Sequence, residues 1–590
     1  KRRWIESVLP AAMVAVEVVH GWGRVFTCLQ RAGRYGCVAL PAGKAGAGLK
    51  MDGGFGMNKQ MNRGWTGLAA LTLVLSLQGC GGGGGEDTSQ TKNLLLSTPV
   101  SVNTPQDMAN EHLAESHDDY NENLSGLITA STLKRWKDDW VNQRPAHITG
   151  KLVILQVSSG GTVNGVVANY IKPDNQNVFT YLTSSGEWTE TRDNGVTVTV
   201  TMVASGAKMD ESLNKYNIDP SKDMIVIAPG AGSYGNPMNT GRIWYAMRYW
   251  GVDTRHLAQL NGANYWEETP GVSGNGLLAA DFSAAASPTP TTPGKFTVKY
   301  LRVDNTQMLA TMADMKTIAP TTDLNDKTDG VFIWDARNLG QYSAGEKAER
   351  GDNALKTNCG PIRTPTNDAA VLASSAYCDA NNVADYKWTF QNSGSRQGHP
   401  NGTLQLQYTN MLEPKKGYGF KPKAELQAYL DGQTDIWGYG FVGSSQQNSY
   451  GLLGAGQAYQ QGDVIYAYCE TTVRAMVTGF AAAAILGKPV RFYDGAMTEW
   501  NSLSYALASN GQYILPSDSP WRSEANSFLR WASDYVGFVS TDVSPRNISN
   551  AYGTPNKITL EDQDYKGVVS SGNGSGSGGG GGVPPNPCGG

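Results

Sequence analysis

Short apolar runs separated by longer amphipathic stretches recur along most of the chain. Two of them, residues 151–159 (KLVILQVSS) and 223–230 (DMIVIAPG), are apolar almost without interruption, as is typical of strands covered on both faces. Residues 128–140 and 241–252 have the spacing of helices instead. This alternation of buried strands and helices predicts an α/β fold in which mainly parallel sheets are flanked by helices.

The same order of elements occurs a second time, beyond a linker. Residues 283–295 (SAAASPTPTTPGK) are rich in Pro, Thr and Ser, which favours an extended connection. After this linker the pattern predicts a helix at 305–315 capped by Asn305 or Thr306, strands at 330–337 and 464–469, a helix at 474–487, and a strand with a turn at 490–500. In the first half we expect Thr129 or Ser131 to cap the helix at 128–140.

The two series of elements match each other and indicate an internal repeat. The first copy ends in an Asn-Gly-Ala turn with Gly262 and Trp266, and the second in an Asp-Gly-Ala turn with Gly495 and Trp500. The predicted parts of the chain are a first domain at 126–282, a second domain at 296–510 with insertions at about 341–396 and 432–462, a C-terminal extension at 511–565 with a helix at 523–538, and a Gly-rich, disordered tail at 566–590.

Composition excludes some functions and leaves others open. The chain of 590 residues has a net charge of −4 and no arginine-rich run, so nucleic acid is not an expected partner. It has seven cysteines without a CxxC pair and only six histidines, so we expect neither a metal site nor another cofactor.

The N-terminal region has the features of an export signal. Residues 57–79 carry Lys and Arg before a short apolar run, and they end in the sequence LQGC at Cys80. This ending resembles the lipobox of bacterial lipoproteins, which implies cleavage before Cys80, lipidation of its thiol and attachment to a membrane. An outer-membrane location is expected because Gly, and not Asp, follows Cys80. We expect residues 1–56 to be absent from the mature protein and residues 80–125 to form a polar tether.

Export would place the protein in an oxidising compartment. We then expect Cys359 and Cys378, which share one irregular polar segment, to form a disulfide, the alternative being two free thiols. Cys588 near the C-terminus could pair with another chain, the alternative being a flexible end without a function. The insertions could shape a specific pocket or bind a protein partner.

Cys469 is the strongest candidate for chemistry. It ends the predicted strand VIYAYC, and a helix is expected to begin at about Val473 or Arg474. The loop between them can turn its backbone N–H groups toward the sulfur, and such amide nests favour the thiolate, which is the reactive form. The position also fits the preference of open α/β sheets for binding ligands at the carboxyl ends of strands. The alternative is an inert thiol packed at a strand end.

Several segments resemble the rhodanese family of sulfurtransferases. The pattern concerned is a strand, a six-residue loop from Cys469 to Arg474, a helix, a strand and a Tyr-Asp-Gly turn followed by Trp500. FIWDARNLGQYSAGE resembles the Asp-x-Arg strand end of the family, and GHPNGTLQLQYTNML and GYGFKPKAELQAYL resemble two further segments in the same order. A first copy without a thiol and a second copy with one is the arrangement of tandem sulfurtransferases. The resemblance covers roughly residues 126–510.

The resemblance implies roles for single residues. Cys469 would be the nucleophile that accepts a sulfur atom as a persulfide, and the backbone from Glu470 through Thr471, Thr472 and Val473 to Arg474 would cradle that persulfide. Asp335 and Arg337 would brace the site from the neighbouring strand. The remaining candidates, His399, Asp494 and Trp500, are expected to be structural.

Other positions depart from the family pattern. Thiosulfate-using relatives carry cations directly after the cysteine, whereas this chain has Glu470 and Thr471 there. The usual loop glycine is Thr472, and an arginine beyond the Asp-x-Arg pair is replaced by Gln341. Repulsion between Glu470 and an anionic donor would amount to about 1–4 kcal/mol at contact distance.

These observations predict an exported, lipid-anchored sulfurtransferase that moves sulfur from a small donor to a thiophilic acceptor through Cys469. Two alternatives stay open. One is the same fold acting on another donor, such as 3-mercaptopyruvate or a chalcogen oxyanion. The other is a surface-anchored binding or scaffold protein without turnover.

Overall fold

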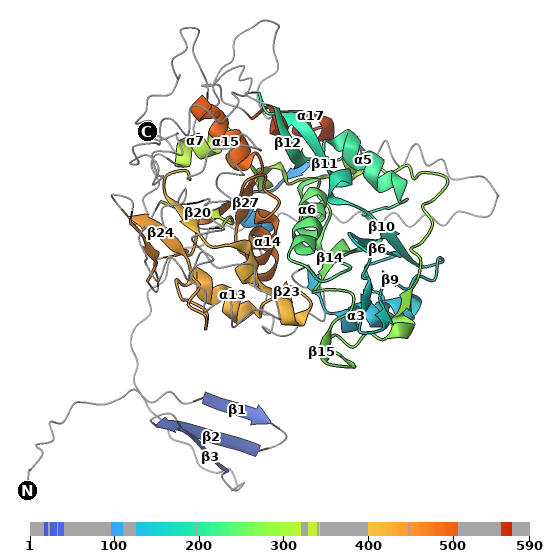
Figure 1. Cartoon of the computed structure of the whole chain (residues 1–590), viewed down its shortest axis with the longest axis vertical. Helices are drawn as coiled ribbons and strands as arrows, with labels where there is room; N and C mark the ends of the chain where they lie inside the picture. Colours follow the sequence, from blue (N-terminus) through green and yellow to red (C-terminus); the bar gives the residue numbers. More distant parts are fainter. Residues whose placement is uncertain are drawn as a thin grey trace, which may run out of the picture. The chain divides into compact units, whose positions relative to one another are not determined.

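The computed structural model describes residues 17–21, 24–31, 34–39, 96–109, 126–195, 198–319, 329–338, 342, 399–445, 449–454, 456, 458–505 and 556–568. The chain divides into two units, Lys1–Gly84 and Gly85–Gly590. The first unit contains an antiparallel sheet of three strands, β1 (Glu17–Gly21), β2 (Arg24–Arg31) and β3 (Arg34–Ala39). All other described elements belong to the second unit (Figure 1).

The first half of the second unit is built on a parallel sheet of five strands. Their order is β10-β6-β13-β14-β5, and every neighbouring pair is parallel. The strands are β5 (Leu127–Ile128), β6 (Leu152–Gln156), β10 (Val178–Leu182), β13 (Met224–Ala228) and β14 (Leu257–Leu260). The helices of this half are α3 (Ala130–Asp138), α4 (Trp140–Gln143), α5 (Gly206–Lys215) and α6 (Gly235–Tyr249).

The second half is built on a mixed sheet of seven strands in the order β19-β27-β26-β20-β21-β24-β25. Its first five strands are parallel, and the last two are antiparallel additions at one edge. The strands are β19 (Leu309–Ala310), β20 (Val331–Asp335), β21 (Thr403–Gln405), β24 (Val442–Ser445), β25 (Ser449–Leu452), β26 (Val464–Tyr468) and β27 (Val490–Tyr493). The helices are α7 (Met312–Ile318), α13 (Lys423–Leu430), α14 (Ala475–Phe480) and α15 (Ala496–Tyr505).

Short pairs of strands decorate the two sheets. They are β7 (Thr162–Val163) with β8 (Val166–Val167), β9 (Tyr170–Ile171) with β17 (Phe282–Ser283), β11 (Thr189–Asp193) with β12 (Val198–Val203), β15 (Glu267–Thr269) with β16 (Val272–Ser273), β4 (Ser101–Val102) with β18 (Val303–Asp304), and β22 (Leu412–Glu413) with β23 (Gly419–Phe420). The antiparallel pair β11–β12 and helix α6 both contribute to the site described below.

The predicted fold class is confirmed, since both large sheets are mainly parallel and flanked by helices. The strands predicted at 151–159 and 223–230 form as β6 and β13, and every residue in them is buried. Helix α3 forms as expected, and Thr129 is its cap because the Thr129 side chain accepts a hydrogen bond from the backbone of Thr132.

Other expected elements differ from the prediction. Residues 305–315 do not form one helix: residues 306–308 form a 3₁₀ turn, β19 follows, and α7 begins only after Thr311. The reason is that Leu309 and Ala310 pair with β27 at the sheet edge, while Thr311 supplies a full capping box. The helix after Arg474 changes at Ala481 to π-helical geometry, and the turn after β27 continues into α15.

Two segments outside the predicted domains are folded. Part of the expected tether forms β4 and a capped turn, α2 (Pro105–Met108), and β4 pairs with β18. Within the C-terminal extension, α17 (Lys557–Lys566) packs on the first half, where Asp562 forms a buried ion pair with Arg192. Both segments gain order from tertiary contacts that local sequence does not reveal.

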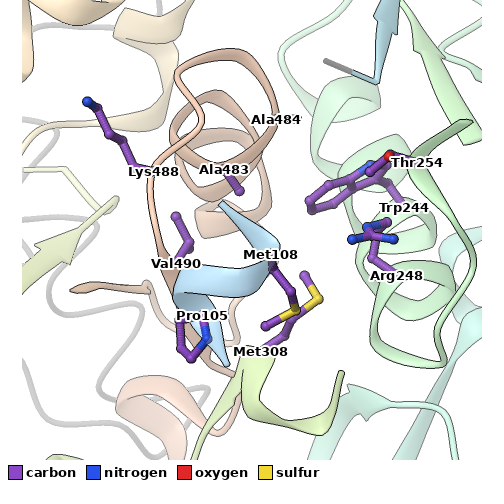
Figure 2. Close-up of a pocket in the computed structure, with 10 residues that line it drawn as sticks. All are labelled: Pro105, Met108, Trp244, Arg248, Thr254, Met308, Ala483, Ala484, Lys488 and Val490. Carbon is purple, nitrogen blue, oxygen red and sulfur yellow. The ribbon is translucent and has the colours of Figure 1, made fainter. Parts of the chain in front are cut away.

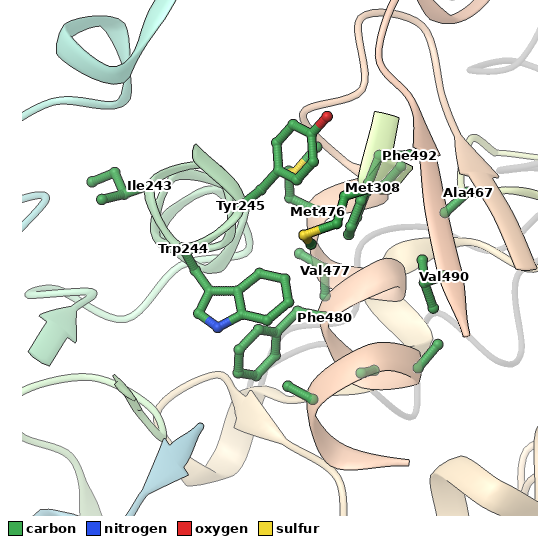
Figure 3. Close-up of a cluster of buried hydrophobic side chains, with 14 of the residues drawn as sticks. Ile243, Trp244, Tyr245, Met308, Ala467, Met476, Val477, Phe480, Val490 and Phe492 are labelled. Atoms are coloured by element: carbon green, nitrogen blue, oxygen red, sulfur yellow. The ribbon is translucent and has the colours of Figure 1, made fainter. Parts of the chain in front are cut away.

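The two halves pack through helices α6 and α14, which lie side by side (Figure 3). Gly241 of α6 permits this close approach, since a Cβ there would lie 2.9 Å from the Cβ of Met476 on α14. The rings of Trp244 and Phe480 meet edge to face at 5.0 Å between centroids. One continuous apolar cluster therefore joins the halves, and it extends to β26 and Cys469.

Candidate active site

Cys469 follows directly after the last residue of β26, where the strand ends. Its thiol is free, and only 1% of the residue is exposed. The loop from Cys469 to Arg474 then leads into α14. The thiol thus lies at the carboxyl end of a central parallel strand, as the sequence predicts, but it is almost closed off from solvent.

The loop after Cys469 presents unused backbone donors. The N–H groups of Glu470, Thr471, Thr472 and Val473 donate to no acceptor within the part of the chain that the structure describes. Thr472 has a φ of +53°, an unusual conformation for a β-branched residue, and it makes the loop curl. Consecutive free amides in such a curl form a concave site for an anion.

Side-chain and backbone contacts hold this loop in place. The carbonyl oxygen of Glu470 accepts hydrogen bonds from the backbone N–H and the hydroxyl of Thr498, at 3.1 and 2.7 Å. The hydroxyl of Thr472 donates to the carbonyl oxygen of Tyr493 at 2.6 Å. These bonds offset part of the cost of the strained φ and fix the loop against the start of α15.

Asp335 and Arg337 form a buried ion pair on the neighbouring strand. Arg337 Nε and Nη2 donate to the Asp335 carboxylate at 3.0 and 2.6 Å, and both side chains are fully buried. Burial alone would lower the pKa of Arg337, but the Asp335 carboxylate raises it above its ordinary value. The hydroxyl of Tyr468, the residue before Cys469, also donates to Asp335, at 2.9 Å. The pair therefore ties the end of β20 to Tyr468, the last residue of β26.

Glu470 turns its carboxylate into this charged group. Its Oε2 lies 3.5 Å from Arg337 Nη1, and 9% of the residue is exposed. The sequence predicts Glu470 as a charge that faces the donor, whereas the folded chain places one of its oxygens against Arg337. The two residues come together because Glu470 follows β26 and Arg337 follows the adjacent β20.

Two tyrosines, one of which is close enough to Cys469 to interact with it, are not evident from the sequence. Burial raises the pKa of Tyr408, and two neighbours act on the same hydroxyl, Arg474 lowering its pKa and Cys469 raising it. The ring of Tyr408 meets the edge of Tyr234, which precedes α6 in the first half, at 6.4 Å between centroids. Tyr408 lies in GHPNGTLQLQYTNML, a segment that resembles the rhodanese family, and this resemblance is the one feature of the sequence that could have indicated it.

The first half also reaches the loop through β12. The hydroxyl of Thr201 is 3.5 Å from the carbonyl oxygen of Thr471, and Thr201 has a positive φ of 57°. Arg242 of α6 donates to the carbonyl oxygen of Thr201 and forms a buried ion pair with Asp494. The first half thus approaches the cysteine loop at Thr471 and contacts the second half at Asp494.

The remaining predicted residues are placed as follows. His399 is fully buried, its Nδ1 lies 2.8 Å from the carbonyl oxygen of Tyr342, and burial lowers its pKa to about 4. Trp500 is buried below the second sheet. Gln341, Cys80, Cys359, Cys378 and the helix expected at 523–538 lie outside the described residues.

A separate pocket lies between α6 and α14 at their carboxyl-terminal ends (Figure 2). Its lining includes Met108 of α2, Trp244 and Arg248 of α6, and Ala484 beyond α14. None of the predicted catalytic residues lines it. The described residues hold no cluster of three His, Cys, Asp or Glu suited to a metal, and no described helix has the length and apolar character needed to cross a bilayer.

Comparison with known proteins finds similarity in three dimensions alone. No family model matches the chain, and a search of curated proteins finds no match. Among solved structures, Tum1 from Saccharomyces cerevisiae is 14% identical, with a TM-score of 0.35 over 62% of this chain and 93% of that chain. SseA from Escherichia coli, described as a 3-mercaptopyruvate sulfotransferase with the rhodanese fold, is 15% identical, with a TM-score of 0.33 over 63% and 98%.

A third structure is the anaerobic ergothioneine biosynthesis enzyme from Chlorobium limicola. It is 12% identical to this chain, with a TM-score of 0.38 over 68% of this chain and 72% of that chain. These similarities concern the fold, and the chemistry of the present site follows from its own residues.

Proposed function

We propose that the protein is a sulfurtransferase that carries sulfur on Cys469 as a persulfide. The observation that supports this most directly is the loop from Glu470 to Val473, whose four N–H groups have no acceptor among the described residues. A terminal persulfide sulfur is anionic near neutral pH, so it is the kind of group that such a nest stabilises.

The chemistry needs no cofactor. The Cys469 thiolate attacks the outer sulfur of a donor, an Sγ–S bond forms, and the bond from that sulfur to the leaving group breaks, its electron pair leaving with that group. A nucleophilic acceptor then attacks the outer sulfur of the persulfide. The Sγ–S bond breaks, and its electron pair returns to Cys469 as the thiolate.

The other residues of the site act by positioning. The Asp335–Arg337 pair fixes the strand end next to the thiol, and the Thr472 and Thr498 hydrogen bonds preserve the curl of the loop. Because 1% of Cys469 is exposed, donor and acceptor reach it only after a covering group moves. Tyr408 and Tyr234 lie where the two halves meet near the thiol and are the first candidates for that movement.

The test is direct detection of the persulfide. The full chain is incubated with inorganic polysulfide, thiosulfate or 3-mercaptopyruvate, and the peptide containing Cys469 is examined for the added mass of one sulfur atom. Transfer of that sulfur to cyanide is then followed as thiocyanate. The proposal fails if no donor modifies Cys469, or if Cys469→Ser retains turnover.

The burial of Cys469 favours a second candidate, a binding protein that keeps the fold without turnover. In that case no donor would add sulfur to the thiol in the folded protein, while the same thiol would react after denaturation. A thiol-specific reagent applied with and without urea separates this outcome from simple loss of the cysteine by oxidation.

We also propose, from the sequence of residues 57–80, that this activity is located at the cell envelope through a lipid on Cys80. The test is metabolic labelling with a radioactive fatty acid in a bacterial host. Wild-type protein is expected in the membrane fraction with label, and Cys80→Ser without label.

A further inference from the structure

The carboxylate of Glu470, the residue after Cys469, has an oxygen without a hydrogen-bond partner among the described residues. Its Oε1 is buried and forms no hydrogen bond within the described part of the chain, while Oε2 is at the limit of hydrogen-bonding distance from Arg337 Nη1, at 3.5 Å. A buried acceptor left unpaired is costly, so a ligand that supplies a donor to Oε1 gains that energy on binding.

The charges around Glu470 specify the kind of donor. Arg337 is already engaged by Asp335 through its Nε and Nη2, and Tyr468 gives Asp335 a further hydrogen bond. Asp335, Arg337 and Glu470 together therefore carry one net negative charge in the protein interior. A cationic ligand group compensates this charge, whereas a dianionic donor adds to it.

We infer that the physiological donor or acceptor is a small thiol, or its persulfide, that carries an ammonium group, and that Glu470 binds this group. The inference rests on the proposed persulfide chemistry of Cys469 and adds a substrate class to it. Glu470 directly follows Cys469 in the chain, so the test below uses thiols whose charged or hydroxyl group is two carbons from the sulfur.

The acceptor step tests this with two thiols of equal size. Cys469 is first loaded with inorganic polysulfide, whose S–S bond breaks to release hydrosulfide, and the excess is removed. The loaded protein is then mixed with cysteamine or with 2-mercaptoethanol, which has a hydroxyl in place of the ammonium group. Loss of one sulfur atom from Cys469 is timed by mass spectrometry, and the ratio of the two rates is measured.

The decisive comparison is this ratio in wild-type protein and in Glu470→Gln, since intrinsic differences between the two thiols cancel. We expect the preference for cysteamine to fall about tenfold in Glu470→Gln, the effect of losing one charge-assisted hydrogen bond. Glu425→Gln, which removes an exposed carboxylate from α13, is the matched control and should leave the ratio unchanged. Glu470→Asp, with a shorter side chain, should give an intermediate ratio and replaces Glu470→Gln if that variant does not fold.

The outcomes separate the two proposals. An equal ratio in wild type and Glu470→Gln overturns the role of Glu470 while leaving persulfide transfer intact. Failure to load Cys469 at all overturns the proposed function and the inference with it.

Discussion

The loops that follow β13 and β26 occupy equivalent positions in the two halves, but they differ in which of their backbone N–H groups have acceptors. Ala228 at the end of β13 lies opposite Gln156, and Tyr468 at the end of β26 lies opposite Asp335. The next residue is a proline in the first half and Cys469 in the second. The registers thus make the two loops equivalent, although their sequences do not align.

In the first half the backbone groups of the loop are occupied by a side chain from the end of the neighbouring strand, β6. The hydroxyl of Ser158 donates to the carbonyl oxygen of Pro229 at 2.8 Å and accepts from the N–H of Ala231 at 3.0 Å. Gly230 is packed so tightly that a Cβ would lie 1.9 Å from the Ser158 carbonyl oxygen. In the second half the N–H groups of Glu470 to Val473 have no such acceptor among the described residues. The two halves therefore differ in whether a side chain from the neighbouring strand end occupies the backbone groups of the loop.

The contacts between the halves also come in an equivalent pair, one of which carries charge. The Asn261 side chain accepts a hydrogen bond from the N–H of Phe420 in the second half, at 2.7 Å, and Asp494, its counterpart, accepts one from the N–H of Val203 in the first half, at 2.6 Å. Asp494 alone adds an ion pair, with Arg242. The contact at Asp494 therefore includes an ion pair, whereas the corresponding contact at Asn261 is a neutral hydrogen bond.

The largest expected effect comes from removing the thiol. Cys469→Ser should lower sulfur transfer by at least about a thousandfold, because a serine hydroxyl is not ionised near neutral pH and cannot form a persulfide. Transfer to cyanide from polysulfide is the measurement.

The reciprocal change, which moves the cysteine to the first half, tests whether the loop after β13 can replace the loop after β26. A second cysteine in the first half, Pro229→Cys, placed in the Cys469→Ser background, should not restore transfer, because Ser158 already occupies the N–H of Ala231. Recovery of turnover in this double variant would show that the hydrogen bond between Ser158 and Ala231 does not prevent catalysis in the first half.

The next effect concerns the ion pair next to the thiol. Arg337→Ala should lower the free energy of unfolding by about 3–5 kcal/mol, because Asp335 and Glu470 are then left as buried, unpaired carboxylates. The matched variant in the first half, Ser158→Ala, removes neutral hydrogen bonds and should cost about 1 kcal/mol. Urea unfolding of both variants measures the difference, and equal losses would contradict the proposed asymmetry in charge.

An effect of intermediate size on the pH dependence of stability is expected at Glu499, which lies on α15. Burial, with the Asp494 charge in addition, raises the Glu499 pKa from 4.5 to about 7. Between these pH values the folded state binds a proton that the unfolded state has released, so this group makes stability fall as pH rises from about 4.5 to about 7. The loss amounts to roughly 2–4 kcal/mol.

Glu499→Gln should remove this part of the pH dependence, so the variant gains stability relative to wild type between pH 5 and pH 8. Urea unfolding at several pH values is the measurement, and Glu425→Gln is the control with an exposed carboxylate. A constant difference between wild type and Glu499→Gln across this range would exclude titration of Glu499.

The smallest effect is expected at the strained loop residue. Thr472→Ala keeps the positive φ and loses the hydrogen bond to Tyr493, so it should cost about 1 kcal/mol. Thr472→Gly loses the same bond but relieves the strain, and its stability should lie within about 0.5 kcal/mol of wild type. Thermal unfolding ranks the two variants, and a less stable glycine variant would mean that the loop depends on the threonine for more than its conformation.

The sequence alone predicts the parts of the molecule that depend on local pattern. Continuous apolar runs predict β6, β13, β20 and β26 because strands buried on both faces need apolar residues at every position. The position of Cys469 between a strand and a helix is likewise evident from neighbouring residues, as is the duplication of the elements. The prediction of a helix at 305–315 was wrong because β19 pairs with β27, and a local pattern does not reveal a contact between such distant segments.

Tertiary structure decides the surroundings of the thiol. Glu470 meets Arg337, Thr201 meets Thr471, and Tyr234 meets Tyr408, and in each case the partners are more than a hundred residues apart in the chain. Parallel strands require long crossovers, so the residues that share one sheet edge come from distant segments whose pairing no local pattern encodes. The sequence therefore determines that a thiol ends this strand, whereas the pairing of distant strands and the packing of the two halves decide which donors and charges surround it.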